Sequence, residues 1–167
     1  MIMLLEEEAS ERSGRCRRNK TNILFAMKEM SKARILAKRS VASVLNERKL
    51  LDKLKHPFLV NMRYAFQDRE TLYLVMDYLS GGDLRYHIGI RRVFSEDETK
   101  FIIQCIIVGL EYMHNNSVIH RDIKPENLVL DSAGYVRLTD MGIARIWSKD
   151  NGKETSGTPG YMAPEVM

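Results

Sequence analysis

Residues 95–113 constrain the fold of this chain more than any other segment. Ser95 is followed three residues later by Glu98, the spacing of a capping box, which predicts that a helix begins here. The residues that follow, 99–113, are apolar on almost every side of such a helix. Because a helix without a polar face has to be covered by protein, we expect this helix to be buried.

Hydrophobic periodicity divides the rest of the chain into a strand-rich first part and a mainly helical second part. Strands are expected at residues 23–30, 59–67, 72–76, 127–130 and 135–139, and a further helix at 41–54. Gly81 and Gly82 interrupt the pattern, so a joint between two lobes is expected near residues 78–82. The predicted fold class is α+β.

Composition excludes several classes of protein. With 44% hydrophobic and 29% charged residues, the chain is globular, and no apolar stretch reaches the ~18 residues of a membrane span. The net charge of +4 suits phosphate-bearing ligands, but the basic run at 12–20 lacks interleaved aromatics, so no nucleic-acid partner is expected. Cys16 and Cys105 form no C-x-x-C pair and suit a reducing, intracellular compartment, cytoplasmic or nuclear.

Polar motifs follow one another along the chain in a fixed order. They are Ala26-Met27-Lys28 on a strand, Glu47 on the apolar face of the next helix, His120-Arg121-Asp122 with Asn127, Asp140-Met141-Gly142, and Ala163-Pro164-Glu165. A glutamate on an apolar face requires a partner, because a lone buried charge is costly. Each motif alone is weak evidence. Together, over residues 23–167, they resemble the signature of the protein kinase family.

Several short sequence segments resemble those of the serine/threonine kinases close to the cyclic-AMP-dependent enzyme. Lys124, two residues after Asp122, is the serine/threonine form of this loop. The same likeness extends to His56-Pro57-Phe58-Leu59-Val60, Gly81-Gly82-Asp83-Leu84, and Gly157-Thr158-Pro159 with Tyr161. The resemblance implies a two-lobed fold that transfers the ATP γ-phosphoryl group to serine or threonine hydroxyls of protein substrates.

The resemblance also assigns ATP- and Mg²⁺-binding roles. Lys28 would bind the α- and β-phosphates and Glu47 would hold it in place, while Asn127 and Asp140 would offer oxygen ligands to Mg²⁺. The adenine pocket, expected at the joint between the lobes, would be lined by Ala26, Met76, Tyr78 and Val129. Each assignment has a structural alternative, because these residues could also form a simple ion pair, a turn or packed core.

Two residues of the loop would act on the transferred group. Asp122 would orient the substrate hydroxyl and accept its proton, and Lys124 would neutralise charge on the phosphoryl group. Asp122 as a loop cap is the structural alternative. His120 is expected to be a packed, hydrogen-bonded histidine, and Thr158 to hydrogen-bond the loop rather than only to begin a turn.

The chain departs from the family at three places. Residues 1–22 carry no glycine-rich loop: Glu6, Glu8 and Glu11 fall near the glycine positions, and only Gly14 is nearby. We therefore expect an irregular leader over 1–22, a partial first lobe over 23–78 whose sheet lacks its first hairpin, and a partial second lobe over 79–167. With no helices after the activation segment, apolar surface would be exposed or covered by a partner. The third departure, Met141 for phenylalanine, is a packing change.

Acidic residues suggest how activity and specificity are set. In related enzymes the arginine at Arg121 meets an activation-segment phosphate, and here Glu154 stands at that position, with Thr155 and Ser156 as alternative modification sites. Asp83 and Glu126 match positions that read arginines upstream of the target residue. The alternative is ordinary surface acidity.

Three functional interpretations remain open from the sequence. The first is an active serine/threonine kinase. The second is a catalytically impaired kinase fragment that acts as a binding or regulatory module, because the glycine loop and later helices are lacking. The third is a partial product without a stable fold, since each partial lobe approaches the size at which a single core supplies little stability.

Overall fold

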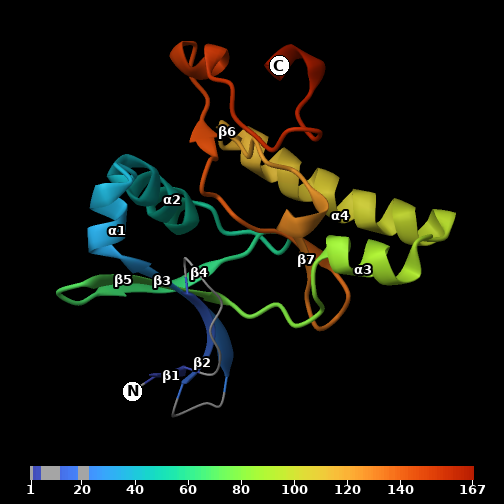
Figure 1. Ribbon diagram of the computed structural model, residues 1–167. Coiled ribbons are helices and arrows are strands. Elements are labelled where there is room, and N and C mark those ends of the chain that lie inside the picture. The colour runs from blue at the N-terminus through green and yellow to red at the C-terminus, as the bar shows by residue number, and fades with distance from the viewer. Residues whose placement is uncertain (1, 5–11, 19–22) are drawn as a thin grey trace. The chain divides into compact units, whose positions relative to one another are not determined.

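The computed structural model describes residues 2–4, 12–18 and 23–167. The chain forms two compact units (Figure 1). The first comprises the residues up to Asp52 together with Asn61–Tyr78, and the second comprises Lys53–Val60 and Leu79–Met167. Each unit is built from its own elements, so the two are treated in turn.

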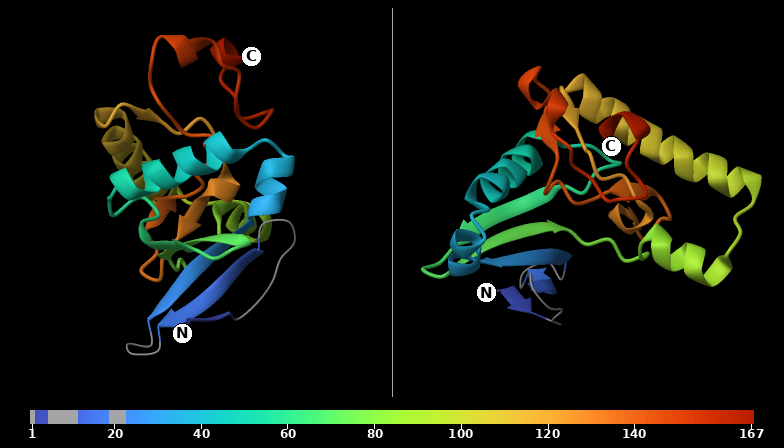
Figure 2. Two further views of the ribbon diagram at one scale, coloured as in Figure 1. Left: turned by 90° about the vertical axis from the view of Figure 1, so that its left-hand side faces the viewer. Right: turned by 45° about the horizontal axis from the view of Figure 1, so that its top comes forward.

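An antiparallel sheet forms the first unit (Figure 2). Its strands lie in the order β1 (Ile2–Leu4), β2 (Arg12–Arg18), β3 (Leu24–Ser31), β5 (Thr71–Asp77) and β4 (Met62–Gln67). The core includes Met27 and Val75, against which Phe25 and Tyr73 pack. Two helices, α1 (Lys32–Ala37) and α2 (Val41–Lys53), follow β3, and α2 buries Leu50 and Leu51.

The beginning of the chain differs from the sequence expectation. An irregular course is predicted for residues 1–22, and a sheet without its first hairpin, but β1 and β2 pair antiparallel and β2 pairs with β3. The prediction is wrong because charge-rich β2 shows no alternation, while its pairing uses backbone groups that any residue supplies. Gly14 lies opposite Met27. Glu6, Glu8 and Glu11 lie outside the described residues.

The second unit is built around α4 (Glu96–Asn115), preceded by α3 (Leu84–Arg91). The predicted capping box is present, with Ser95 and Glu98 satisfying each other's backbone N–H groups. One face of α4 is buried through Cys105, Ile106, Gly109 and Met113. A Cβ on Gly109 would lie 2.6 Å from Leu138 Cδ1, so glycine allows the close approach to β8 (Val136–Leu138).

The opposite face of α4 remains exposed among the described residues. Its apolar side chains there are Ile103, Ile107 and Val108, each 38–57% exposed. The described residues do not cover this face of the helix, so the expectation of an exposed apolar surface is confirmed for them.

Short strands hold the loops of the second unit. They pair as β6 (Val118–Ile119) with β9 (Arg145–Ile146) and as β7 (Leu128–Leu130) with β8. Three 3-10 turns complete the unit: η1 (Pro125–Asn127), η2 (Asp150–Lys153) and η3 (Pro164–Val166). Within the described part of the chain, no helix combines the length and apolar character required to cross a membrane.

The strand predicted over residues 59–67 is split between the units. Leu59 forms a bridge with Leu138, and Val60 donates its N–H to the Leu138 carbonyl in the second unit. From Asn61 onward the segment belongs to the first unit, and β4 begins one residue later. Nothing in the sequence of this segment marks a break, so only its two different pairing partners reveal the division.

Candidate functional site

Lys28 and Glu47 form an ion pair within the first unit. The Lys28 ammonium, on β3, donates to both carboxylate oxygens of Glu47, on α2, at 3.0 and 3.2 Å. Glu47 is only 5% exposed and the Lys28 side chain 15%. The partner that Glu47 requires is thus Lys28, and the pair holds the ammonium in one place.

The residues expected around adenine occupy strand positions and a strand end. Ala26 on β3 lies directly opposite Met76 on β5, and both are partly buried. Tyr78 ends the first unit, and Val129 lies in β7 of the second unit, opposite Arg137. Their role as a nucleotide pocket remains a prediction.

Asp122 is the centre of a hydrogen-bonded cluster in the second unit. Thr158 Oγ1 donates to Asp122 Oδ1 at 2.6 Å, while the Lys124 ammonium and the Asn127 amide approach Asp122 Oδ2 at 2.8 and 3.0 Å. Lys124 also donates to Thr158 Oγ1 at 2.8 Å. The loop therefore brings Asp122, Lys124 and Asn127 together, as the sequence predicts. The expected contact of Thr158 with the loop is confirmed.

The charges in this cluster stabilise each other. Burial alone would raise the pKa of Asp122, but hydrogen bonds from Lys124 and Thr158 outweigh it, so its pKa is lowered. The hydrogen bond to Asp122 raises the pKa of Lys124, and the charge of Asp140 adds to this. At neutral pH Asp122 is a carboxylate, able to accept a hydrogen bond from a hydroxyl.

His120 supports the loop from beneath, as expected. Its ring is 1% exposed, Nε2 hydrogen-bonds the Thr139 carbonyl at 2.9 Å, and Nδ1 accepts from the Asp122 backbone N–H at 3.3 Å. Burial lowers the pKa of His120 below its ordinary value. A neutral imidazole with Nε2 protonated satisfies both contacts, so the ring fixes the backbone of Asp122.

Asn127 and Asp140 are the residues expected to bind Mg²⁺. The Asn127 amide nitrogen is taken up by the Asp122 carbonyl and carboxylate, which leaves its oxygen for a ligand. Asp140 Oδ1 accepts from the Gly142 N–H at 3.0 Å and its residue is exposed. No cluster of three or more His, Cys, Asp or Glu side chains able to hold a metal occurs in the described ranges.

This donor set still fits Mg²⁺, because that ion is usually held by one or two protein oxygen ligands and completes its shell with phosphates and water. Met141, the residue after Asp140, is 1% exposed and packs as expected.

Two residues of the site adopt a backbone conformation that is rare for side-chain-bearing residues. Arg121 has φ 70° and Asp140 has φ 61°. Such conformations cost free energy and persist only where surrounding contacts impose them. They flank the residues expected to act on phosphate, so the contacts around them define the geometry of the loop.

Arg121 reaches the activation segment. Its Nη1 donates to Glu154 Oε2 at 2.8 Å and its Nε donates to the Ile143 carbonyl at 2.8 Å. The pairing of Arg121 with the residue at position 154, expected from the sequence, is confirmed as a contact. What this ion pair does for activity remains a hypothesis.

The residues expected to read substrate arginines have structural contacts of their own. Asp83 caps α3 by accepting from the Tyr86 N–H at 2.7 Å. Glu126, in η1, is 42% exposed in its side chain and lies 3.9 Å from Arg85 Nε. α3 packs against η1, so the two acidic residues belong to one region of the second unit.

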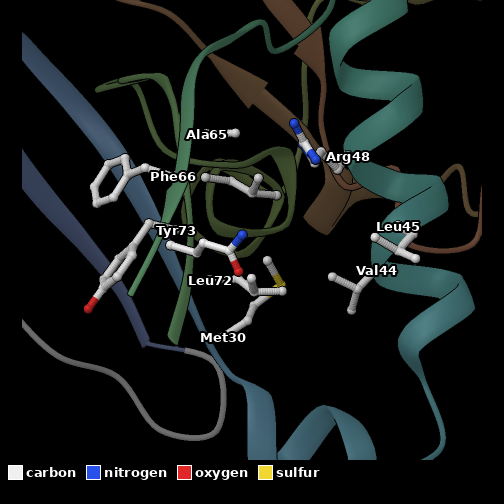
Figure 3. Close-up of a pocket in the computed structure, with 10 residues that line it drawn as sticks. Met30, Val44, Leu45, Arg48, Ala65, Phe66, Leu72 and Tyr73 are labelled. Atoms are coloured by element: carbon white, nitrogen blue, oxygen red, sulfur yellow. The ribbon is translucent and has the colours of Figure 1, made fainter. Parts of the chain in front are cut away.

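The sequence did not predict a pocket in the first unit. A pocket of about 180 Å³ in the first unit lies between α2 and the strands β3–β5 (Figure 3). Its lining includes Met30, Val44, Leu72 and the Phe66–Tyr73 stack, with Arg48 at one side. The apolar face of α2 was the available signal, but Arg48 and Phe66 come together only through tertiary packing.

Comparison with known proteins bears on this geometry. The chain matches the protein kinase domain family over residues 12–167. It is 46% identical to a probable serine/threonine-protein kinase of Dictyostelium discoideum over 88% of this chain and 33% of the relative. It is 43% identical to RAC-beta serine/threonine-protein kinase B of Xenopus laevis (90% and 32%), and 44% identical to human beta-adrenergic receptor kinase 1 (91% and 22%).

The chain thus spans about a third or less of the length of these relatives. The RAC-beta and beta-adrenergic receptor kinases belong to the cyclic-AMP-dependent-kinase-like group that the sequence motifs indicate. The ordered motifs, the α+β elements and the family match agree, and we conclude that this chain belongs to the protein kinase family.

Proposed function

We propose that the protein is a serine/threonine kinase that transfers the γ-phosphoryl group of ATP to serine or threonine hydroxyls of protein substrates. The observation that carries this proposal is the cluster of Asp122, Lys124 and Thr158, which holds an ionised carboxylate beside an ammonium group. Phosphoryl transfer depends mainly on positioning and charge neutralisation, and this cluster supplies both.

The reaction assigns one task to each side chain. Asp122 orients the substrate hydroxyl and takes its proton as the hydroxyl oxygen bonds to the γ-phosphorus and the bond to the ADP oxygen breaks. Lys124 neutralises the charge of the group in transfer. Asn127 also hydrogen-bonds Asp122 and therefore holds the carboxylate in position.

ATP and Mg²⁺ are the general requirements of the family. Lys28, held by Glu47, would contact the phosphates, while Ala26, Met76, Tyr78 and Val129 would line the adenine pocket. Asn127 and Asp140 would hold Mg²⁺, which supplies positive charge to the phosphate groups when bound. The proposed reaction takes place inside the cell, in the cytoplasm or nucleus, because a free buried thiol such as Cys105 suits a reducing compartment.

Protein substrates with arginine upstream of the target residue fit Asp83 and Glu126. The two carboxylates lie in one region of the second unit, and Glu126 already lies near a guanidinium, that of Arg85. A peptide array checks this: we expect a preference for upstream arginine that weakens in Glu126→Gln. An array without any arginine preference overturns the assignment.

A non-catalytic binding module is the second candidate. The observation in its favour is the exposed apolar face of α4, with Ile107 57% and Ile103 46% exposed, which a partner protein could cover. This function needs the surface of α4 and does not need Asp122.

Phosphotransfer to a peptide substrate from Mg-ATP separates the two candidates. We expect Asp122→Asn to lower kcat on the order of 10² to 10⁴-fold, the range for loss of a general base, without weakening ATP binding. Glu111→Gln, which removes an exposed carboxylate from α4, is the matched control and keeps full activity. Equal rates for the wild type and Asp122→Asn would remove the kinase proposal and leave the binding module.

A further inference from the structure

Glu126, one of the carboxylates proposed to read a substrate arginine, already has a cation beside it. The Nε atom of Arg85 lies 3.9 Å from Glu126 Oε1, which is close enough for an ion pair but longer than a hydrogen bond. Both side chains are exposed, Arg85 at 64% and Glu126 at 42%. The charge of Glu126 is therefore partly balanced, while a substrate side chain can still reach it.

The turn that carries Glu126 fixes its place next to the cluster around Asp122. Glu126 lies in η1, and the N–H of the next residue, Asn127, donates to the Lys124 carbonyl at 2.9 Å. The pKa of Lys124 is raised first by its hydrogen bond to Asp122, and the charge of Glu126 adds to this. A substrate side chain bound at Glu126 would thus lie near the residues that act on the phosphoryl group.

The first turn of α3 presents Arg85 to this carboxylate. Asp83 caps the helix by accepting from the Tyr86 N–H at 2.7 Å, and its backbone forms a bridge with Val129 of β7. The helix also packs against η1. These contacts fix the start of α3, so the backbone of Arg85 stays beside the turn that carries Glu126.

The position of Arg85 is not explained by the stability of α3. The N-terminal end of a helix carries a partial positive charge, so an arginine in the first turn is unfavourable for the helix itself. Arg91, in the last turn of the same helix, has the favourable place and pairs with Glu98 at 2.7 Å. The carboxylate of Glu126 therefore accounts for Arg85 better than helix stability does.

We infer that Arg85 is a specificity-determining residue, because it competes with an upstream arginine of the substrate for Glu126. A substrate guanidinium has to approach this carboxylate against the charge of Arg85. Arginine is therefore preferred over a neutral residue by less than Glu126 alone would produce. The inference rests on the proposed function, and it names the residue of this chain that limits how strongly upstream arginine is selected.

Two peptides that differ only in an upstream arginine or glutamine test the inference, with the ratio of their kcat/KM values as the readout. We expect Arg85→Gln to raise the arginine-to-glutamine ratio about two- to fivefold, the size expected for an exposed ion pair. Arg85→Lys retains the charge and should keep the ratio near that of the wild type. Arg92→Gln is the matched control, because it removes an exposed arginine at the other end of α3, and it should leave the ratio unchanged.

The same substitution in a Glu126→Gln background shows whether Arg85 acts at this carboxylate. Without Glu126 the substrate arginine is no longer drawn to this place, so Arg85→Gln should have little further effect on the ratio. A wild-type ratio in Arg85→Gln would overturn the inference. A rise that is equally large in the Glu126→Gln background would also overturn it, because Arg85 would then act only through the net charge of the protein.

Peptide binding to the Asp122→Asn protein supplies a readout that requires no phosphoryl transfer. Fluorescence anisotropy of the two labelled peptides gives the ratio of their Kd values, and we expect Arg85→Gln to shift it toward arginine by a similar factor. If the wild type phosphorylates neither peptide, the proposed function fails, while the binding ratios still decide the role of Arg85. Binding ratios that Arg85→Gln leaves unchanged count against the inference.

Discussion

Glu47 in the first unit and Asp122 in the second are both buried carboxylates beside an ammonium group, yet the units hold them differently. Glu47 pairs with Lys28, from an element 19 residues earlier. Asp122 has three side-chain partners, two of them within five residues of it. One site joins two regular elements through an ion pair, and the other is a network of three side chains around one carboxylate.

This difference separates the consequences of losing a partner. When one member of a buried ion pair is removed, the other charge stays in a low-dielectric environment, and the folded state becomes less stable. When one member of a network is removed, the remaining donors still satisfy the carboxylate, so function suffers more than folding. We therefore expect the first unit to show its defects in stability and the second in rate.

The largest expected effect is the loss of Glu47. Glu47→Ala leaves the Lys28 ammonium without its buried carboxylate, so we expect the free energy of unfolding to fall by about 3 kcal/mol. Chemical denaturation with matched m-values measures this change. ATP binding should weaken in the same variant, because the ammonium is no longer held in place.

A double substitution provides the control for this prediction. Lys28→Met with Glu47→Leu replaces the pair by apolar side chains and should recover most of the lost stability, although not ATP binding. A double variant as unstable as Glu47→Ala would show that packing of the glutamate, rather than its charge, is what the first unit needs.

The next effect in size concerns Thr158 in the network. Thr158→Ala removes the hydroxyl that bonds both Asp122 and Lys124, and we expect kcat to fall about tenfold while the unfolding free energy changes little. Thr158→Ser keeps the hydroxyl and should keep most of the rate. A Thr158→Ala protein that unfolds far more easily but retains its rate would reverse the comparison between the units.

The smallest effect is a pH dependence that arises from His120. Burial lowers the pKa of His120 from the ordinary 6.5. At pH values between the lowered pKa and 6.5, the unfolded chain therefore binds a proton that the folded chain does not. Its contribution to stability is complete above about pH 6.5 and is lost as pH falls below that value. The thermal midpoint, measured from about pH 7.5 to about pH 5, should therefore decline on the acid side.

His56, whose pKa is also lowered by burial, contributes in the same direction. The variant His56→Phe preserves its ring stack with Tyr112 and isolates the His120 contribution, which His120→Gln should abolish. If the thermal midpoint of His120→Gln declined as steeply with falling pH, the pH dependence would arise from other groups.

Local chemistry made several features predictable. The three-residue spacing of Ser95 and Glu98 predicts the capping box that begins α4. The position of Glu47 on an apolar helix face predicts a buried partner. Lys124 and Asn127 are close to Asp122 in sequence, so their contacts with it follow from the loop itself. Helices α1 and α3 and the short strands β6 and β9 were not predicted, because segments of two to eight residues display too little periodicity.

The sequence by itself determined the α+β class, the family and the identities of the charged residues, since these rest on periodicity and on motifs read in order. Only the tertiary structure decided that β1 and β2 extend the sheet and that residues 59–67 are divided between two pairing partners. Backbone pairing between strands depends on where the chain returns in space, and no local pattern records that position.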